Sequence, residues 1–173
     1  MDIAKIAVSL VFSAIIIITD YREYRIKNKS VIAFSAFGLL MNLTAGGLSG
    51  LLDSFLGLVI PLALLPLFAL GMLGAGDVKA LCALGSIAGW RKSVYIAAFS
   101  FVAGGVIAVF FMLLRKNALH RMKRFGAYVK QCFYTRSLLS YKEFTDEKSG
   151  FRFSLGIAAG YAAVVALDCL GYL

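Results

Sequence analysis

Apolar residues occur along this chain in long runs that are separated by short polar or glycine-containing breaks. A transmembrane helix needs roughly 20 predominantly apolar residues, and six runs are candidates for such spans. They are Ile3–Thr19, Ser30 to about Leu48, Leu51 to about Leu73, Val78 to about Trp90, Val94–Leu114 and Phe153–Leu173. The pattern therefore predicts an all-α polytopic membrane protein with six transmembrane helices.

Two of the runs are irregular. Pro61 and Pro66 lie inside the third run and are expected to kink it, because membrane helices tolerate proline better than soluble helices do. The fourth run is short, so the turn before it is expected to dip below the lipid headgroups. Non-helical backbone at that depth is stable only where protein covers it or where it faces a wet cavity.

The composition agrees with a membrane protein. The 173 residues are 61% hydrophobic with a mean hydropathy of +0.85, whereas soluble domains are nearer half apolar. This length predicts a single membrane-embedded domain over residues 1–173. Little positive charge precedes residues 3–19 and no clear Ala-x-Ala cleavage site follows them, so this run is expected to be retained as a span. Cys82, Cys132 and Cys169 form no close pair, which argues against a disulfide framework or a metal knuckle.

The basic residues predict the orientation of the chain. Four lie between the first two runs, one follows the third run, and ten lie between Arg115 and Arg152, so fifteen of the 18 share one side. These are Arg22, Arg25, Lys27, Lys29, Lys79, Arg115, Lys116, Arg121, Lys123, Arg124, Lys130, Arg136, Lys142, Lys148 and Arg152. By the positive-inside rule this side is cytoplasmic and both termini are outside. Lys5, Arg91 and Lys92 remain on the other side.

The net charge of +9 is attributed to this topology and to anionic lipid headgroups, and no nucleic-acid partner is expected. The cytoplasmic loop of about residues 115–152 mixes basic and aromatic residues in its first half. That part is expected to form an amphipathic helix on anionic headgroups.

Two aspartates stand out as candidate catalytic groups. Asp77 follows Gly74-Ala75-Gly76 between two apolar runs, and Asp20 ends the first run. Both are predicted at the cytoplasmic edge of the membrane. Burial of an ionisable group there costs free energy, so its presence indicates a functional role. Two carboxylates that share one proton can hydrolyse a peptide bond, one as a base on water and the other as an acid on the carbonyl. The pattern therefore indicates a membrane-embedded aspartyl protease without a cofactor or metal.

Gly74 and Gly76 are expected to support this site, because glycine permits unusual dihedral angles and close helix approach. Each aspartate, taken alone, has a bland alternative as a helix cap or a solvated charge. The joint pattern favours catalysis, although it leaves open which aspartate is protonated. Asp53 and Asp168 are predicted toward the outer side and fit the site less well.

Three blocks of sequence resemble, in the same order, motifs of one known family. Leu73–Lys79, followed by Ala83-Leu84-Gly85 and Gly89, resembles the signature of type IV prepilin peptidases. Asp20–Asn28 resembles the first catalytic block of that family, and Phe153–Gly160 resembles its last-helix motif. The size resembles the compact branch that serves Flp (tight-adherence) pili, and the archaeal preflagellin peptidases.

The resemblance implies that Asp20 and Asp77 are the catalytic pair. It also implies an endopeptidase of the inner (cytoplasmic) membrane that removes a short basic leader from pilin-like precursors at the cytoplasmic face. Lys27 and Arg152 stand where the family usually has proline, which leaves the subfamily open. The cysteine-pair domain of longer relatives is absent, so N-methylation is not supported.

Three alternatives remain at this point. They are a proton-coupled transporter that uses an acid pair, a non-catalytic membrane component of a secretion or pilus system, and a signal-peptide-peptidase-like enzyme. The substrate pilin and the oligomeric state are not indicated by the sequence.

Overall fold

The computed structural model describes residues 3–23, 26–70, 73–114 and 153–172, and the elements in these residues are all helical. They are α1 (Ile3–Glu23), α2 (Asn28–Val59), the 3-10 helix η1 (Ile60–Leu64), α3 (Leu65–Ala69), α4 (Ala75–Ala88), α5 (Trp90–Leu114) and α7 (Ser154–Cys169). The all-α prediction is confirmed for this part of the chain. The cytoplasmic loop predicted at about residues 115–152 lies outside the described residues.

The helix α2 is a hairpin of two legs, because the chain reverses at Gly47. This glycine has φ 59° and ψ −142°, a conformation that residues with a Cβ rarely adopt. Gly38 lies against Ile87 and Gly57 lies against Gly85, so both positions of α2 reach the same turn of one neighbouring helix. If α2 were straight, the 19 residues from Gly38 to Gly57 would separate them by about 28 Å. The two legs correspond to the second and third apolar runs, which were expected to separate between Leu48 and Leu51.

The prolines predicted as kinks lie where regular α-helix stops. Pro61 is near the start of η1 and Pro66 is near the start of α3, so the second leg passes through a 3-10 turn before its last short helix. A proline near a helix start is favourable because the N–H that it lacks would have no partner there. The third run was expected to stay helical to about Leu73, whereas α3 ends at Ala69.

Three helical stretches are long and apolar enough to cross a membrane: Ile3–Arg22, Asn28–Ala69 and Trp90–Phe111. The second stretch contains the hairpin, and the apolar helix Ser154–Cys169 is shorter. The helix α4 has only 14 residues, and nine of them are buried by the surrounding helices. The fold is therefore that of a membrane protein, and six complete crossings stay a prediction.

The short helix α4 is held by close backbone contacts with α2. A Cβ placed on Gly85 would lie 2.1 Å from the carbonyl oxygen of Gly57, so the two helices touch backbone to backbone. The side chains of Asn42 and Ser54 donate hydrogen bonds to the carbonyl oxygen of Ser86, at 3.0 and 2.5 Å. Inside a membrane the lipid is as apolar as the side chains, so helices associate through close contacts of small residues and through interhelical hydrogen bonds.

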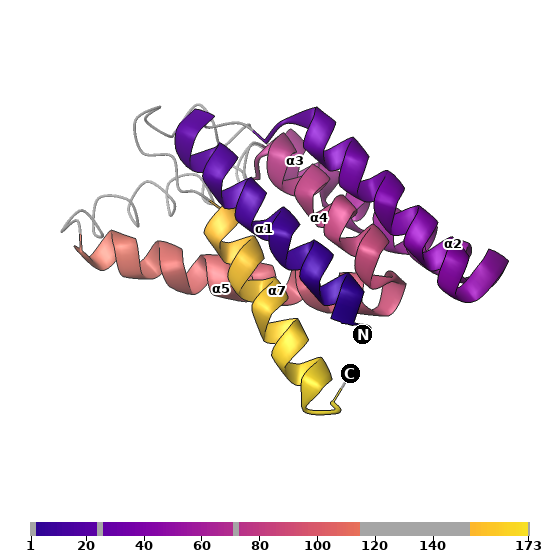
Figure 1. Cartoon of the computed structure of the whole chain (residues 1–173). Helices are drawn as coiled ribbons and strands as arrows, with labels where there is room; N and C mark the ends of the chain where they lie inside the picture. Colours follow the sequence, from indigo (N-terminus) through magenta and orange to yellow (C-terminus); the bar gives the residue numbers. More distant parts are fainter. Residues whose placement is uncertain (1–2, 24–25, 71–72, 115–152, 173) are drawn as a thin grey trace.

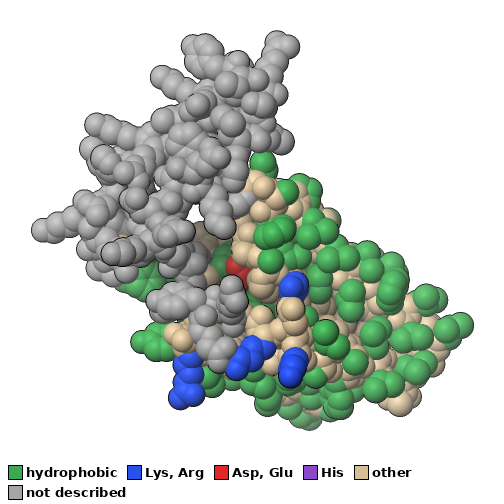
Figure 2. Space-filling model, turned by 90° about the horizontal axis from the view of Figure 1, so that it is seen from above, with side chains coloured by type: hydrophobic (Ala, Val, Ile, Leu, Met, Phe, Trp, Pro, Cys, Tyr) green, Lys and Arg blue, Asp and Glu red, His purple; other side chains and the backbone are tan. Residues whose placement is uncertain are grey.

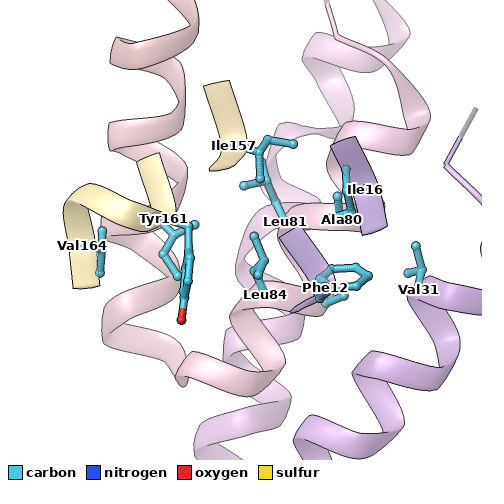
Figure 3. Close-up of a cluster of buried hydrophobic side chains, with 11 residues drawn as sticks. Phe12, Ile16, Val31, Ala80, Leu81, Leu84, Ile157, Tyr161 and Val164 are labelled. Atoms are coloured by element: carbon cyan, nitrogen blue, oxygen red, sulfur yellow. The ribbon is translucent and has the colours of Figure 1, made fainter. Parts of the chain in front are cut away.

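One apolar core joins α1, α2, α4, α5 and α7. Figure 3 shows its side chains, which belong to a cluster of buried residues comprising Phe12, Ile16, Val31, Ala80, Leu81, Ala83, Leu84, Ile96, Ile157, Tyr161 and Val164. In Figure 1, α1 begins and α7 ends at the same end of the molecule, as the predicted topology of the termini requires. The opposite end therefore brings together the end of α1 and the starts of α2, α4 and α7.

The contact between Gly57 and Gly85 leads to a first prediction. Gly85→Ala should lower the free energy of unfolding by about 1–3 kcal/mol, because the new methyl group overlaps the Gly57 carbonyl and the Ser93 hydroxyl. Thermal unfolding in mild detergent measures the effect. Gly105→Ala in α5 is the matched control, since a Cβ there meets nothing within 4 Å. Equal unfolding temperatures for the two variants would contradict the close packing of α2 on α4.

Candidate active site

The register of the core brings Asp20 and Asp77 to one end of the molecule. Ile16 on α1 and Ala80 on α4 pack in the same cluster. Asp20 follows Ile16 by four residues and Asp77 precedes Ala80 by three, so each lies about one turn beyond its core residue. Because α1 leads toward this end and α4 leads away from it, both turns extend to the same side of the core.

The surroundings of Asp77 disfavour its charged form. Asp77 lies in the first turn of α4, outside the three candidate membrane stretches. Burial and then the charge of Asp20 raise the pKa of Asp77 from 3.8 to about 6, against the opposing effect of a hydrogen bond with the Gly74 backbone. Two adjacent carboxylates repel one another when both are ionised, so such a pair keeps one proton to a higher pH than a lone carboxyl group does.

Gly74 and Gly76 support Asp77 through the space they leave, and the expected unusual dihedral angles are wrong. Gly74 caps α4 with φ −75° and ψ 142°, an extended conformation open to any residue, and neither glycine is among those with positive φ. A Cβ on Gly74 would lie 2.8 Å from Oδ2 of Asp77, and one on Gly76 would lie 3.3 Å from the Ile26 side chain. Glycine at these two positions thus leaves room for the Asp77 carboxyl group and for the Ile26 side chain.

The sequence analysis missed one contact of the site. The hydroxyl of Ser154, at the start of α7, donates a hydrogen bond of 2.5 Å to Oδ2 of Asp20. Ser154 is only 2% exposed and comes from a position 134 residues away along the chain. The only signal for it was its place in the block Phe153–Gly160.

Polar contacts also join the start of α2 to the start of α4. The ammonium group of Lys79 donates to Oδ1 of Asn28 at 3.0 Å, and Ile26 packs against Gly76 just before α2 begins. Figure 2, which views this end, shows a small acidic area with several Lys and Arg side chains on the same face. The starts of α2 and α4 therefore meet at an end of the molecule that carries basic side chains.

Asp53 and Asp168, the other aspartates among the described residues, have structural partners at the opposite end of the molecule. Asp53 accepts a hydrogen bond of 3.3 Å from the Trp90 backbone, which starts α5, and Asp168 forms an ion pair with Lys92. Asp53 is thus near the end of α4, about 18 Å along that helix from Asp77. Neither acid joins Asp20 and Asp77, in agreement with their exclusion from the predicted site. The acids Glu143, Asp146 and Glu147 lie outside the described residues.

Other features of the described residues offer no competing centre. No group of three or more His, Cys, Asp or Glu side chains there is arranged to hold a metal ion. An apolar groove between α1 and α2 is lined by Ala7, Val8, Val11, Ala33, Phe34 and Phe37, which bear no reactive group. The chemistry that this part of the chain can support is acid–base catalysis by two carboxylates.

The family comparison covers both aspartates. A model of the type IV leader peptidase family matches residues 7–109, which is more than half of the chain. No curated protein and no solved structure matches the chain. The match includes α4 and most of α1 but ends before Ser154.

The raised pKa of Asp77 leads to a prediction about stability. Between about pH 4 and pH 6 the folded protein holds a proton on Asp77 that the unfolded chain has lost, so this group makes unfolding easier as the pH rises. Asp77→Asn should therefore raise the free energy of unfolding by about 2 kcal/mol near pH 8 and change it little near pH 4. Thermal unfolding in detergent at the two pH values tests this, and an equal gain at both would contradict it.

Proposed function

The chain belongs to the type IV leader peptidase family and is an aspartic-type prepilin peptidase, and on this premise we propose that Asp20 and Asp77 are its catalytic carboxylates. The observation that carries the proposal is the packing of Ile16 and Ala80 in one core cluster, which brings Asp20 and Asp77, one turn beyond them, to the same end of the molecule. Two helices that are separated in sequence by a complete hairpin supply one acid each to the same end of the molecule. Gly74 and Gly76 leave room for the second acid.

The proposed reaction is general acid–base hydrolysis of a peptide bond. One carboxylate takes a proton from a water molecule as the water oxygen attacks the scissile carbonyl carbon. The other, protonated carboxyl donates its proton to the carbonyl oxygen, which gives a neutral tetrahedral intermediate. The carbon–nitrogen bond then breaks as a proton passes to the leaving amine. One proton shared between two acids is sufficient, so the step requires no metal.

The proposed substrate is the leader of a pilin-like membrane protein. Family membership implies prepilin substrates, and we assign the compact branch that processes Flp-like or archaeal pilin-like precursors. The basic end that carries the two acids is proposed to face the cytoplasm, next to anionic headgroups. A precursor whose apolar helix lies in the membrane would present its short basic leader at this edge. The whole of residues 1–173 is proposed to act as one membrane-embedded domain.

The catalytic proposal predicts the effect of removing either acid. Asp20→Asn and Asp77→Asn should each lower the cleavage rate by at least about a hundredfold, because neither carboxyl alone can both activate water and protonate the carbonyl. The measurement is cleavage of a candidate prepilin by purified enzyme in detergent. Asp53→Asn is the matched control, since an amide oxygen can still accept the Trp90 hydrogen bond. Near-normal cleavage by either site variant would exclude the aspartyl mechanism.

The proposed orientation predicts which loops a membrane-impermeant reagent reaches. Single cysteines introduced within residues 46–50, at the tip of the hairpin, should react from outside the cell, in a background without Cys82, Cys132 and Cys169. Cysteines introduced within residues 115–150 should react only after the membrane is made permeable. The reverse pattern would place Asp20 and Asp77 outside and would separate the site from a cytoplasmic leader.

A further inference from the structure

The hydrogen bond from Ser154 to Asp20 makes the two acids unlike one another. Ser154 is buried, and its hydroxyl donates to Oδ2 of Asp20 at 2.5 Å, whereas the described partner of Asp77 is the Gly74 backbone. A serine hydroxyl has a single proton to donate. The bond therefore distinguishes Asp20 as the acid whose carboxyl group is held by a side chain of another helix.

The position of Ser154 is fixed by tight packing of α7 on its neighbours. Ile157, one turn later, is 1% exposed in the same core as Ile16 and Ala80. A Cβ on Gly156 would lie 2.8 Å from Cα of Gly104 in α5, so the first turn of α7 cannot shift toward α5. The ring of Phe153 packs against Phe101 with centroids 5.3 Å apart. The hydroxyl is thus presented to Asp20 by a rigid element.

We propose that Ser154 is a positioning residue that orients the carboxyl group of Asp20 for the attack of water on the scissile bond. This inference rests on the proposed function. In the productive state Oδ2 of Asp20 accepts the hydrogen bond of the Ser154 hydroxyl, and Oδ1 is left to face the attacking water.

The test compares kcat and KM for cleavage in wild type and Ser154→Ala. Loss of the Ser154 hydroxyl should lower kcat by roughly tenfold and leave KM unchanged, because Asp20 loses the hydrogen bond that orients it. Ser154→Thr keeps a hydroxyl and should restore kcat. Ser93→Ala is the matched control, because Ser93 is buried and donates to the Gly57 carbonyl.

The outcomes separate this inference from the proposed function. If Ser154→Ala keeps the wild-type kcat, or if its kcat falls no more than that of Ser93→Ala, the positioning role is wrong while the aspartate pair can still be correct. A fall in kcat that Ser154→Thr does not restore would show a structural role only and would also contradict it. Loss of the proposed function itself would be seen in Asp20→Asn and Asp77→Asn, which would then retain cleavage.

Discussion

The candidate site depends on one apolar cluster, which contains Ile16 of α1, Ala80 of α4 and Ile157 of α7. Asp20, Asp77 and Ser154 each lie three or four residues from one of these members, toward the same end. A helical turn rises about 5.4 Å, so packing of the cluster places all three polar groups about one turn beyond it. The apolar core thus converts three distant positions in the sequence into one polar site.

The site lies at the start of a helix that could not stand alone. The helix α4 has only 14 residues, and isolated helices of that length are marginal even in water. It is enclosed by the two legs of α2, with backbone contact between Gly57 and Gly85 and hydrogen bonds from Asn42 and Ser54. These contacts hold the far end of α4, while burial at its first turn disfavours the charged form of Asp77.

Much of the fold followed from patterns within single segments. The apolar runs predicted the helices, and the break near residue 48 agrees with the reversal at Gly47. Asp20 and Asp77 were predicted to share one end because charge distribution and run order both require it. The expected backbone role of Gly74 and Gly76 was wrong, since sequence shows that glycine is present but not whether dihedral angle or space demands it. Ser154 was missed because a serine in an apolar run is common, and its partner is 134 residues away.

One of the basic residues that depart from the positive-inside rule has a structural partner. Lys92 is on the side predicted to be outside, and its ion pair with Asp168 from α7 compensates its charge. Asp53 also has a structural contact at this end, because its carboxylate accepts a hydrogen bond from the backbone N–H of Trp90 at the start of α5. Pairing at that end leaves Asp20 and Asp77 as the two described carboxylates that act on each other.

The central claim, that α1 and α4 bring residues 20 and 77 together, is tested most directly by crosslinking in membranes. Asp20→Cys/Asp77→Cys in a background free of native cysteines would be treated with a short thiol crosslinker, and a protease site inserted in the hairpin tip would separate unlinked fragments. The account predicts that the 20–77 pair stays linked after proteolysis and that the matched Asp20→Cys/Asp53→Cys pair separates. Separation of the 20–77 fragments, or equal linkage of both pairs, would contradict it.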